Sequence, residues 1–193
     1  MSGRPEPAPR AVLLRGVNVS GRNRLPMADF RKLLEGLGLQ RVETVIQSGN
    51  AVFCGGPDDD ALAASIRAAL LSAFGFAPEV FLRDLAALEA AMDHPFGPDA
   101  DPSRVHAVFL AEPAPKLDDA RLQAVRTDEA WSLRPGLFLL HTPSGIGRSR
   151  VAEVLPRALK VAQTARNLNT VAALAGMLRL AGGGFLDERP APG

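Results

Sequence analysis

The sequence predicts an α+β fold built from two ferredoxin-like domains in tandem, each with the order βαββαβ, and an extra C-terminal helix. The 193 residues are 47% hydrophobic and 22% charged, which is enough apolar material for one sizeable core or two small ones. Short apolar strands and amphipathic helices then follow one another in the same order twice, which is the order of an antiparallel sheet with helices on one face. We expect domains over 11–84 and 102–181, with a linker helix and turn over 85–101.

The first domain is predicted element by element. "AVLLRGV" is typical of a buried strand, and "MADFRKLLEGLG" of a helix with one apolar face, with Pro26 in its first turn and Gly38 at its end. "RVETVIQ" and "NAVFC" are short strands that "SGN" joins as a tight hairpin. "PDDDALAASIRAALLSAFG" indicates a second helix, whose three leading aspartates suit the positive end of its dipole better than a metal site. "APEVFLRD" is the fourth strand.

The second domain repeats this order after a short helix, "DLAALEAAM", and a turn around "DHPFGPDADP". "RVHAVFLAE" predicts a strand, "KLDDARLQAVR" a helix, and "EAWSLRPGLFLLHT" a hairpin through "RPG". "SRVAEVLPRAL" follows as a helix that Pro156 should kink or split, then a strand "VAQTAR" and a helix "NTVAALAGMLRLA". The duplication rests on element order, because the two halves share little residue-level similarity. The tails, 1–10 and 182–193, are rich in Pro, Gly and charge and are expected to be disordered.

Composition limits the classes of function. Lys plus Arg number 22 against 21 Asp plus Glu, a net charge of +1, so no global field attracts DNA or an acidic membrane and any anion site must be local. The one cysteine, Cys54, excludes an internal disulfide and suits a reducing compartment. The sequence shows neither a membrane-spanning apolar run nor the apolar core of a signal peptide, so we expect a cytoplasmic protein. It carries no signal for an oligomeric state.

Polar side chains gather where the first strand ends. In the predicted topology the first and third strands are antiparallel neighbours, so the end of strand one and the hairpin before strand three share one sheet edge. The helix that starts near Pro26 adds unpaired backbone donors and a partial positive charge, which favour an anion. Asn23 and Arg24 lie above this edge. The residues predicted to line it are Arg15, Gly16, Asn18, Arg22, Gln47, Ser48, Gly49 and Asn50.

A second polar set is predicted at the opposite edge of the second domain, around His141 and the loop "TPSGIGRSR". Glycines before a helix N-terminus, with Arg and Ser at the junction, can cradle a phosphate or a carboxylate. "SGIGRS" lacks the lysine and the spacing of a Walker loop, and each motif by itself also fits a turn or a helix cap. The candidate residues here are Gly145, Arg148, Ser149, Thr164, Arg166, Asn167 and Asn169.

At these residues the sequence resembles a bacterial family catalogued as domain of unknown function 1697. Its signatures resemble "LLRGVNVSGRNRLPM" with "VIQSGNAVF", and the Gly and Ser loop with "QTARNLNT", so the resemblance runs from about Ala11 to Leu178. It implies the two-domain architecture and no established reaction. Leu168 stands where the family usually has Trp, and Val45 where it often has Tyr. The motif positions that the resemblance implies are Arg15, Gly16, Asn18, Gln47, Ser48, Gly49, Asn50, Ser149, Thr164, Arg166, Asn167, Asn169 and Thr170.

Three functions stay open. The first is a site for a small anionic or polar ligand at the junction of the domains, with arginines and backbone amides as donors. The second is RNA binding through backbone phosphates, although the first and third strands offer only Phe53 for stacking. The third is a structural or partner-binding role. The motifs contain no carboxylate, and His141 is the one nearby side chain of a type that titrates near neutrality, so the sequence indicates no reaction, and it indicates no cofactor or metal.

Overall fold

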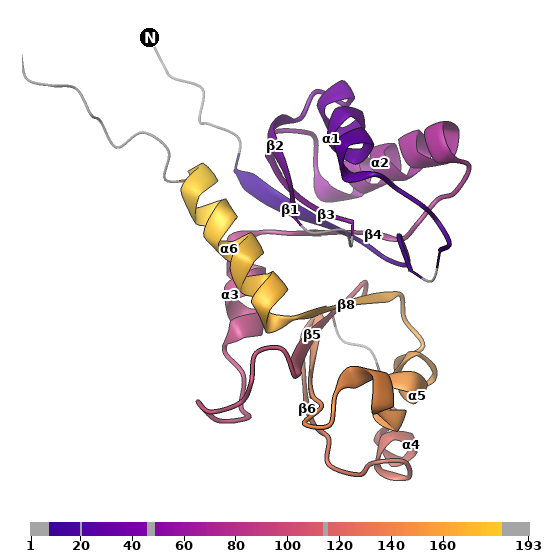
Figure 1. Cartoon of the computed structure of the whole chain (residues 1–193), viewed down its shortest axis with the longest axis vertical. Helices are drawn as coiled ribbons and strands as arrows, with labels where there is room; N and C mark the ends of the chain where they lie inside the picture. The colour runs from indigo at the N-terminus through magenta and orange to yellow at the C-terminus, as the bar shows by residue number, and fades with distance from the viewer. Residues whose placement is uncertain (1–7, 20, 46–48, 114–115, 183–193) are drawn as a thin grey trace, which may run out of the picture.

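The computed structural model describes residues 8–19, 21–45, 49–113 and 116–182 (Figure 1). This part of the chain is a mixed α+β structure with two four-stranded antiparallel sheets and six α-helices. Most of both predicted tails lies outside the described residues. Pro9 and Arg10, which the sequence assigned to the N-terminal tail, belong to the first strand.

The first half carries four strands and three helices. Its sheet has the order β2-β3-β1-β4, so β1 lies between β3 and β4 and is antiparallel to both. The side chain of Asp58 accepts a hydrogen bond from the Ala61 N–H (3.0 Å) and caps the second helix, so the leading aspartate has a structural role. The elements are β1 (Pro9–Leu14), α1 (Met27–Gly36), β2 (Gln40–Val45), β3 (Asn50–Cys54), α2 (Asp59–Phe74), β4 (Val80–Arg83) and α3 (Leu85–Met92).

The second half follows the same path, with the sheet order β6-β7-β5-β8. The helix expected around residues 116–126 shortens to the five residues of α4. The expected split at Pro156 is absent, because α5 runs through that residue to Leu159. The elements are β5 (Val105–Leu110), α4 (Asp119–Gln123), β6 (Ala130–Arg134), β7 (Leu137–His141), a 3₁₀ turn η1 (Ile146–Arg148), α5 (Arg150–Leu159), β8 (Gln163–Asn167) and α6 (Leu168–Gly182).

The two halves match in register as well as in order. Ala11 of β1 pairs with Arg83 of β4, and Ala107 of β5 pairs with Arg166 of β8. The last residue of β1 donates its N–H to the Gly49 carbonyl, and the last residue of β5 donates to the Gly136 carbonyl, both at 2.9 Å. Each half then ends in a helix, so the predicted linker helix (α3) and the predicted extra helix (α6) are equivalent elements. The repeat is βαββαβα, twice.

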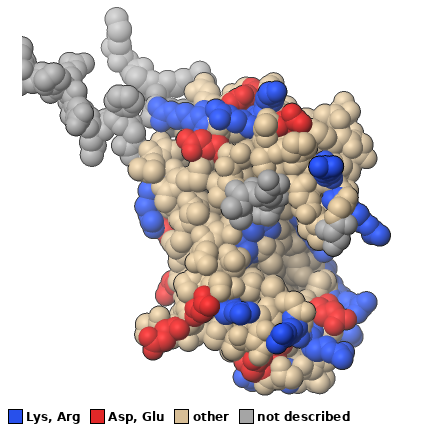
Figure 2. Space-filling model, viewed as in Figure 1, with Lys and Arg blue, Asp and Glu red and all other residues tan. Residues whose placement is uncertain are grey.

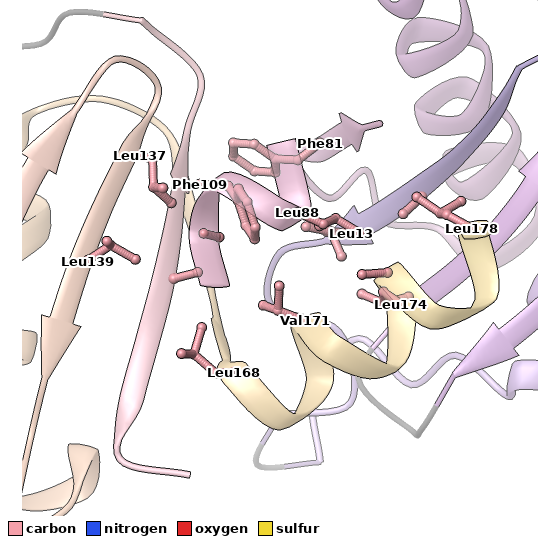
Figure 3. Packing of buried hydrophobic residues seen from close by; sticks show 14 of the residues in the cluster. Leu13, Phe81, Leu88, Phe109, Leu137, Leu139, Leu168, Val171, Leu174 and Leu178 are labelled. Atoms are coloured by element: carbon pink, nitrogen blue, oxygen red, sulfur yellow. The ribbon is translucent and has the colours of Figure 1, made fainter. Parts of the chain in front are cut away.

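Packing explains how the two halves are joined. One face of each sheet is covered by helices of its own half: Val12 and Phe53 pack under α1 and α2, and Val108 and Leu140 under α4 and α5. The other face of each sheet, which we call its inner face, contributes residues to a core that the halves share with α3 and α6, and α6 contacts β1, β3 and β5 (Figure 1). Figure 3 shows this shared core, in which residues of both sheets and of α6 meet. Its labelled members include Leu13, Phe81, Leu88, Phe109, Leu139, Leu168, Val171 and Leu174.

The strand residues Ala11, Leu13, Ala107 and Leu139 of the shared core are fully buried. Burial of this apolar area is the main attraction that holds the halves together. Across the described ranges, no helix has the length and apolar character needed to span a membrane.

Candidate functional site

Arg166 joins the two predicted polar sets. From β8 its Nε donates to Asn50 Oδ1 (2.7 Å) and its Nη2 to the Leu14 carbonyl (2.7 Å), both in the first half. Its Nη1 donates to Thr164 Oγ1 and to the Ala165 carbonyl, each at 2.8 Å. Burial lowers the pKa of Arg166 to about 10, so the guanidinium is still charged at neutral pH. The two motifs therefore meet at one place, which we call the junction.

Arg83 is the counterpart of Arg166 in the first half, and the sequence reasoning missed it. From β4 its Nη2 donates to the carbonyl of Leu110 (2.8 Å), the last residue of β5, and its Nη1 to the Leu82 carbonyl (2.6 Å). Its guanidinium carbon lies 5.7 Å from the Phe81 ring centroid and 5.4 Å from that of Phe109. Burial lowers the pKa of Arg83, against the opposing effect of Asp59 and Asp84. Each half thus binds the other through one arginine, and we call each of these contacts a clasp.

The two clasps have different surroundings. Arg166 lies beside Asn50, which is fully buried, and Thr164, which is 4% exposed. Around Arg83 the equivalent residues are apolar. Leu137 follows the hairpin glycine, as Asn50 does in the first half, and Phe81 lies two residues before Arg83, as Thr164 lies before Arg166. The Arg83 clasp is therefore closed by apolar groups, whereas the Arg166 clasp is polar and is the candidate site.

The loop after β1 is held in shape by two asparagines. Asn18 Nδ2 donates to the Leu25 carbonyl, and Asn18 Oδ1 accepts from the Leu25 N–H, both at 2.8 Å. Asn23 Nδ2 donates to the Gly16 carbonyl (3.0 Å). Both asparagines have left-handed backbone angles, φ 55° and 48°, which asparagine adopts more readily than most residues. Asn18 and Asn23 thus tie together the described residues of the β1–α1 loop (15–19 and 21–26).

Three arginines project from this loop. Arg15, Arg22 and Arg24 are exposed, and among the described residues their side chains have no hydrogen bond or ion pair. Only the backbone of Arg15 is tied down, since its N–H donates to the Glu79 carbonyl (3.0 Å). Figure 2 shows that the surface is indented between the two halves, and that Lys and Arg side chains lie in and beside this indentation. The loop offers cationic groups that the described fold does not use.

The hairpin of the first motif is described only in part. Gln47 and Ser48 lie outside the described residues. Gly49 has φ 71°, and a Cβ there would clash with the Val17 side chain and come within 3.0 Å of Leu14 Cβ. Glycine is therefore required at this position because the backbone passes close to β1.

The second motif is tied to acidic residues that the sequence reasoning did not connect with it. Ser149 caps α5 by accepting from the Ala152 N–H (3.0 Å) and donates to Glu129 Oε1 (2.6 Å). Burial alone would raise the pKa of Glu129, but hydrogen bonds from Ser149 and Thr127 lower it to about 2. Ser144 Oγ donates to Asp128 Oδ2 (2.6 Å). Two carboxylates thus bond to the serines of the glycine loop, which makes it a poor anion cradle.

The other residues of the second motif are spread over several places. Gly145, with φ 94°, packs against the Arg104 side chain, and Arg148 and Asn169 are exposed. Asn167 Oδ1 accepts from the N–H and the hydroxyl of Thr170, both at 3.0 Å, and caps α6. Of this set, Thr164 and Arg166 are the residues that lie beside the described part of the first motif.

The two positions that depart from the family pattern, and His141, are accounted for by packing. Leu168 is 5% exposed in the shared core, so at this position the usual family aromatic would be a core residue, and Val45 packs against the same core. His141 stacks on Phe96, with ring centroids 5.4 Å apart. In the described part of the chain, His, Cys, Asp and Glu form no group that could hold a metal ion.

Comparison with known proteins places the chain in a family. The family described as "Protein of unknown function (DUF1697)" matches residues 8–136. The chain belongs to the DUF1697 family. Its first signature lies inside the matched range, and the residues around Arg166 lie beyond it. The DUF1697 chain is similar to the conserved bacterial protein SP0830 from Streptococcus pneumoniae, with a TM-score of 0.67 and 26% identity over 88% of this chain and 98% of that one. No curated protein matches it.

Proposed function

We propose that this DUF1697 protein binds a small anionic ligand at the junction, where the β1–α1 loop and Arg166 come together. We further infer that each half is a ferredoxin-like plait, because the strand orders β2-β3-β1-β4 and β6-β7-β5-β8 are those of a split βαβ unit with two crossing helices. A cytoplasmic location fits the single cysteine, Cys54, which is free and buried.

One observation carries the proposal. Arg15, Arg22 and Arg24 lie on a loop whose described residues are held by the hydrogen bonds of Asn18 and Asn23, yet among the described residues no acidic side chain pairs with these arginines. Several arginines on a fixed loop can bond the oxygens of a phosphate or carboxylate without a large entropic cost of ordering the loop. With three cationic groups, the site suits a ligand that bears two or more negative charges.

Arg166 has a different role in this proposal. Four of its hydrogen bonds go to protein oxygens, and one of these is the carbonyl of Leu14, the residue before Arg15. We therefore assign Arg166 as a positioning residue that fixes the end of β1 and so the start of the arginine-bearing loop. No side chain at the junction is proposed to transfer a proton or to act as a nucleophile.

RNA binding through a sheet face is less well supported. Phe53, the aromatic residue that the sequence offered for stacking, is fully buried on the helix-covered side, and the other face of each sheet contributes buried residues to the shared core. A grip on backbone phosphates by the loop arginines is the form of nucleic-acid binding that the geometry leaves open. Its affinity would fall steeply with salt, in contrast to that of a single small anion.

The proposal is tested by isothermal titration of the purified full chain with pyrophosphate, nucleoside diphosphates, sugar phosphates and a short RNA. We expect one small anion to bind with a stoichiometry of one and to raise the melting temperature by mass action. Arg15→Ala, Arg22→Ala and Arg24→Ala should weaken binding, while Arg67→Ala, which removes another exposed arginine on α2, serves as the charge control. If Arg67→Ala lost as much ligand affinity as the loop variants, binding would depend on net charge alone and the proposed site would be wrong.

A further inference from the structure

A cavity in the second half, remote from the junction motifs, has the features of a second ligand site. It has a volume of about 620 Å³ and lies between the start of α4 and the end of α5. That volume is within the usual range for pockets that hold small molecules. Its apolar wall is formed by Leu117, Ala158, Leu159 and Val161.

The repeat explains why this space is open. The helices α2 and α5 end in the same way, with a left-handed residue after the last helical one: Gly75 (φ 76°) follows Phe74, and Lys160 (φ 54°) follows Leu159. The next residues are Phe76 in the first half and Val161 in the second.

The first half therefore fills this position with two phenylalanines, whose ring centroids are 6.2 Å apart and which pack against the core of that half. In the second half Leu159 and Val161 stand at their places, and the cavity lies beside them. A smaller side chain at an equivalent position leaves space. The cavity therefore lies where the second half has aliphatic side chains in place of the aromatic rings of the first half.

The charged residues around the cavity divide into engaged and available groups. Asp118 caps α4 and accepts from Arg121 Nε (3.2 Å), and Asp119 Oδ1 accepts from Trp131 Nε1 (3.0 Å). The ammonium groups of Lys116 and Lys160 make no hydrogen bond or ion pair with any residue that the structure describes. Hydrogen bonds from Arg121 lower the pKa of Asp118, and Lys160 lowers it further, so Asp118 and Glu112 are the acids that would compete with a bound anion for the lysines.

We propose that this cavity binds a small anion that carries an aromatic ring, with the ring against Leu159 and Val161 and the anionic group between Lys116 and Lys160. The ring takes the place that Phe74 and Phe76 fill in the first half. Two lysines next to an apolar wall suit an amphiphilic anion, because the ring gains from leaving water while the charge stays at the exposed rim.

The test uses phenyl phosphate as the probe, followed by ¹H–¹⁵N NMR titration of the full chain. We expect shifts confined to residues around α4 and the end of α5, and weaker binding of both inorganic phosphate and phenol. If inorganic phosphate or phenol bound as tightly as phenyl phosphate, the proposal would be overturned, because either the ring or the anionic group would then add nothing to the affinity. Absence of any shift at millimolar phenyl phosphate would overturn it as well.

Two variants copy the first half and separate binding from folding. Val161→Phe restores one ring of the Phe74–Phe76 pair and should abolish probe binding without lowering the melting temperature, because Val161 is only partly buried. Lys160→Gly copies Gly75 and removes one ammonium group at a left-handed position that glycine favours, so the fold is retained. It should weaken phenyl phosphate binding by about two- to fivefold, as expected for a partly exposed charge pair. Unchanged binding in both variants would contradict the site.

Discussion

Arg83 and Arg166 donate hydrogen bonds reciprocally across the two halves, each to the carbonyl oxygen of the last residue of the other half's first strand. They are also equivalent in register, opposite Ala11 and Ala107. The pair offers a matched comparison, because removing either arginine breaks the same backbone contact while only one of them lies beside the polar motifs.

We expect Arg83→Ala and Arg166→Ala each to lower the free energy of unfolding by about 2 to 4 kcal/mol, since each leaves buried carbonyl oxygens without charged donors. Urea denaturation followed by circular dichroism measures this. Only Arg166→Ala should also weaken ligand binding at the junction. A variant pair that loses ligand affinity equally would show that the clasp acts through overall stability alone.

Gly49 is expected to tolerate no side chain. Gly49→Ala should lower the free energy of unfolding by about 2 kcal/mol or more, because left-handed strain of about 1 kcal/mol adds to the clash with Val17. Gly16 has nearly the same backbone angle, φ 69°, with no atom within 4 Å of an added Cβ, so Gly16→Ala should show the strain alone. Thermal denaturation of the two variants checks the difference, and equal losses would contradict it.

Glu129 should make the stability depend on pH in the acid range. Its pKa is lowered from 4.5 to about 2 in the folded state, so the unfolded chain binds more protons between these values. The stabilisation is therefore present above about pH 5 and is lost as the pH falls through 2. Melting temperatures of wild type and Glu129→Gln between pH 7 and pH 2 measure it. We expect the variant to melt lower at pH 7 and to show a shallower acid decline, and an equally steep decline would contradict the assignment.

The cap of α6 gives a further prediction. Asn167 Oδ1 accepts from the backbone N–H of Thr170 at the start of this helix, as Asp84 Oδ1 accepts from that of Ala87 at the start of α3. Asn167→Ala should lower the free energy of unfolding by about 1 kcal/mol, and Asn167→Asp should retain most of the stability. Chemical denaturation compares the two. A destabilised Asn167→Asp would indicate that the amide nitrogen has a role that capping does not explain.

The sequence predicted the strands and most helices because hydrophobic periodicity and turn residues are local signals. It placed Arg15 and Arg166 in one hypothetical ligand site, but whether the two polar sets meet was left open. It missed Arg83, although "FLRD" and "TARN" both place an arginine at a strand end before a helix cap. The equivalence of these two arginines becomes apparent only when β4 and β8 are aligned, because it depends on their register against β1 and β5.

The acidic partners of the glycine and serine loop were not predicted, for a similar reason. Ser149 meets Glu129, 20 residues away, and this pairing depends on how the loop before β6 packs on the start of α5. Sequence spacing carries no information about such a contact. The shared core was not predicted either, because the apolar residues of α3 and α6 fit a linker helix and an extra helix as well as they fit a core between the halves.

The most direct test of the central claim is pyrophosphate titration of wild type, the triple variant Arg15→Ala/Arg22→Ala/Arg24→Ala and Arg67→Ala, with melting temperatures measured in parallel. Exposed arginines without partners should change stability by less than about 0.5 kcal/mol when removed. We expect the triple variant to melt like wild type and to bind at least tenfold more weakly, with Arg67→Ala unchanged. A triple variant that binds pyrophosphate as wild type does, while wild-type binding is measurable, would contradict the site at the junction.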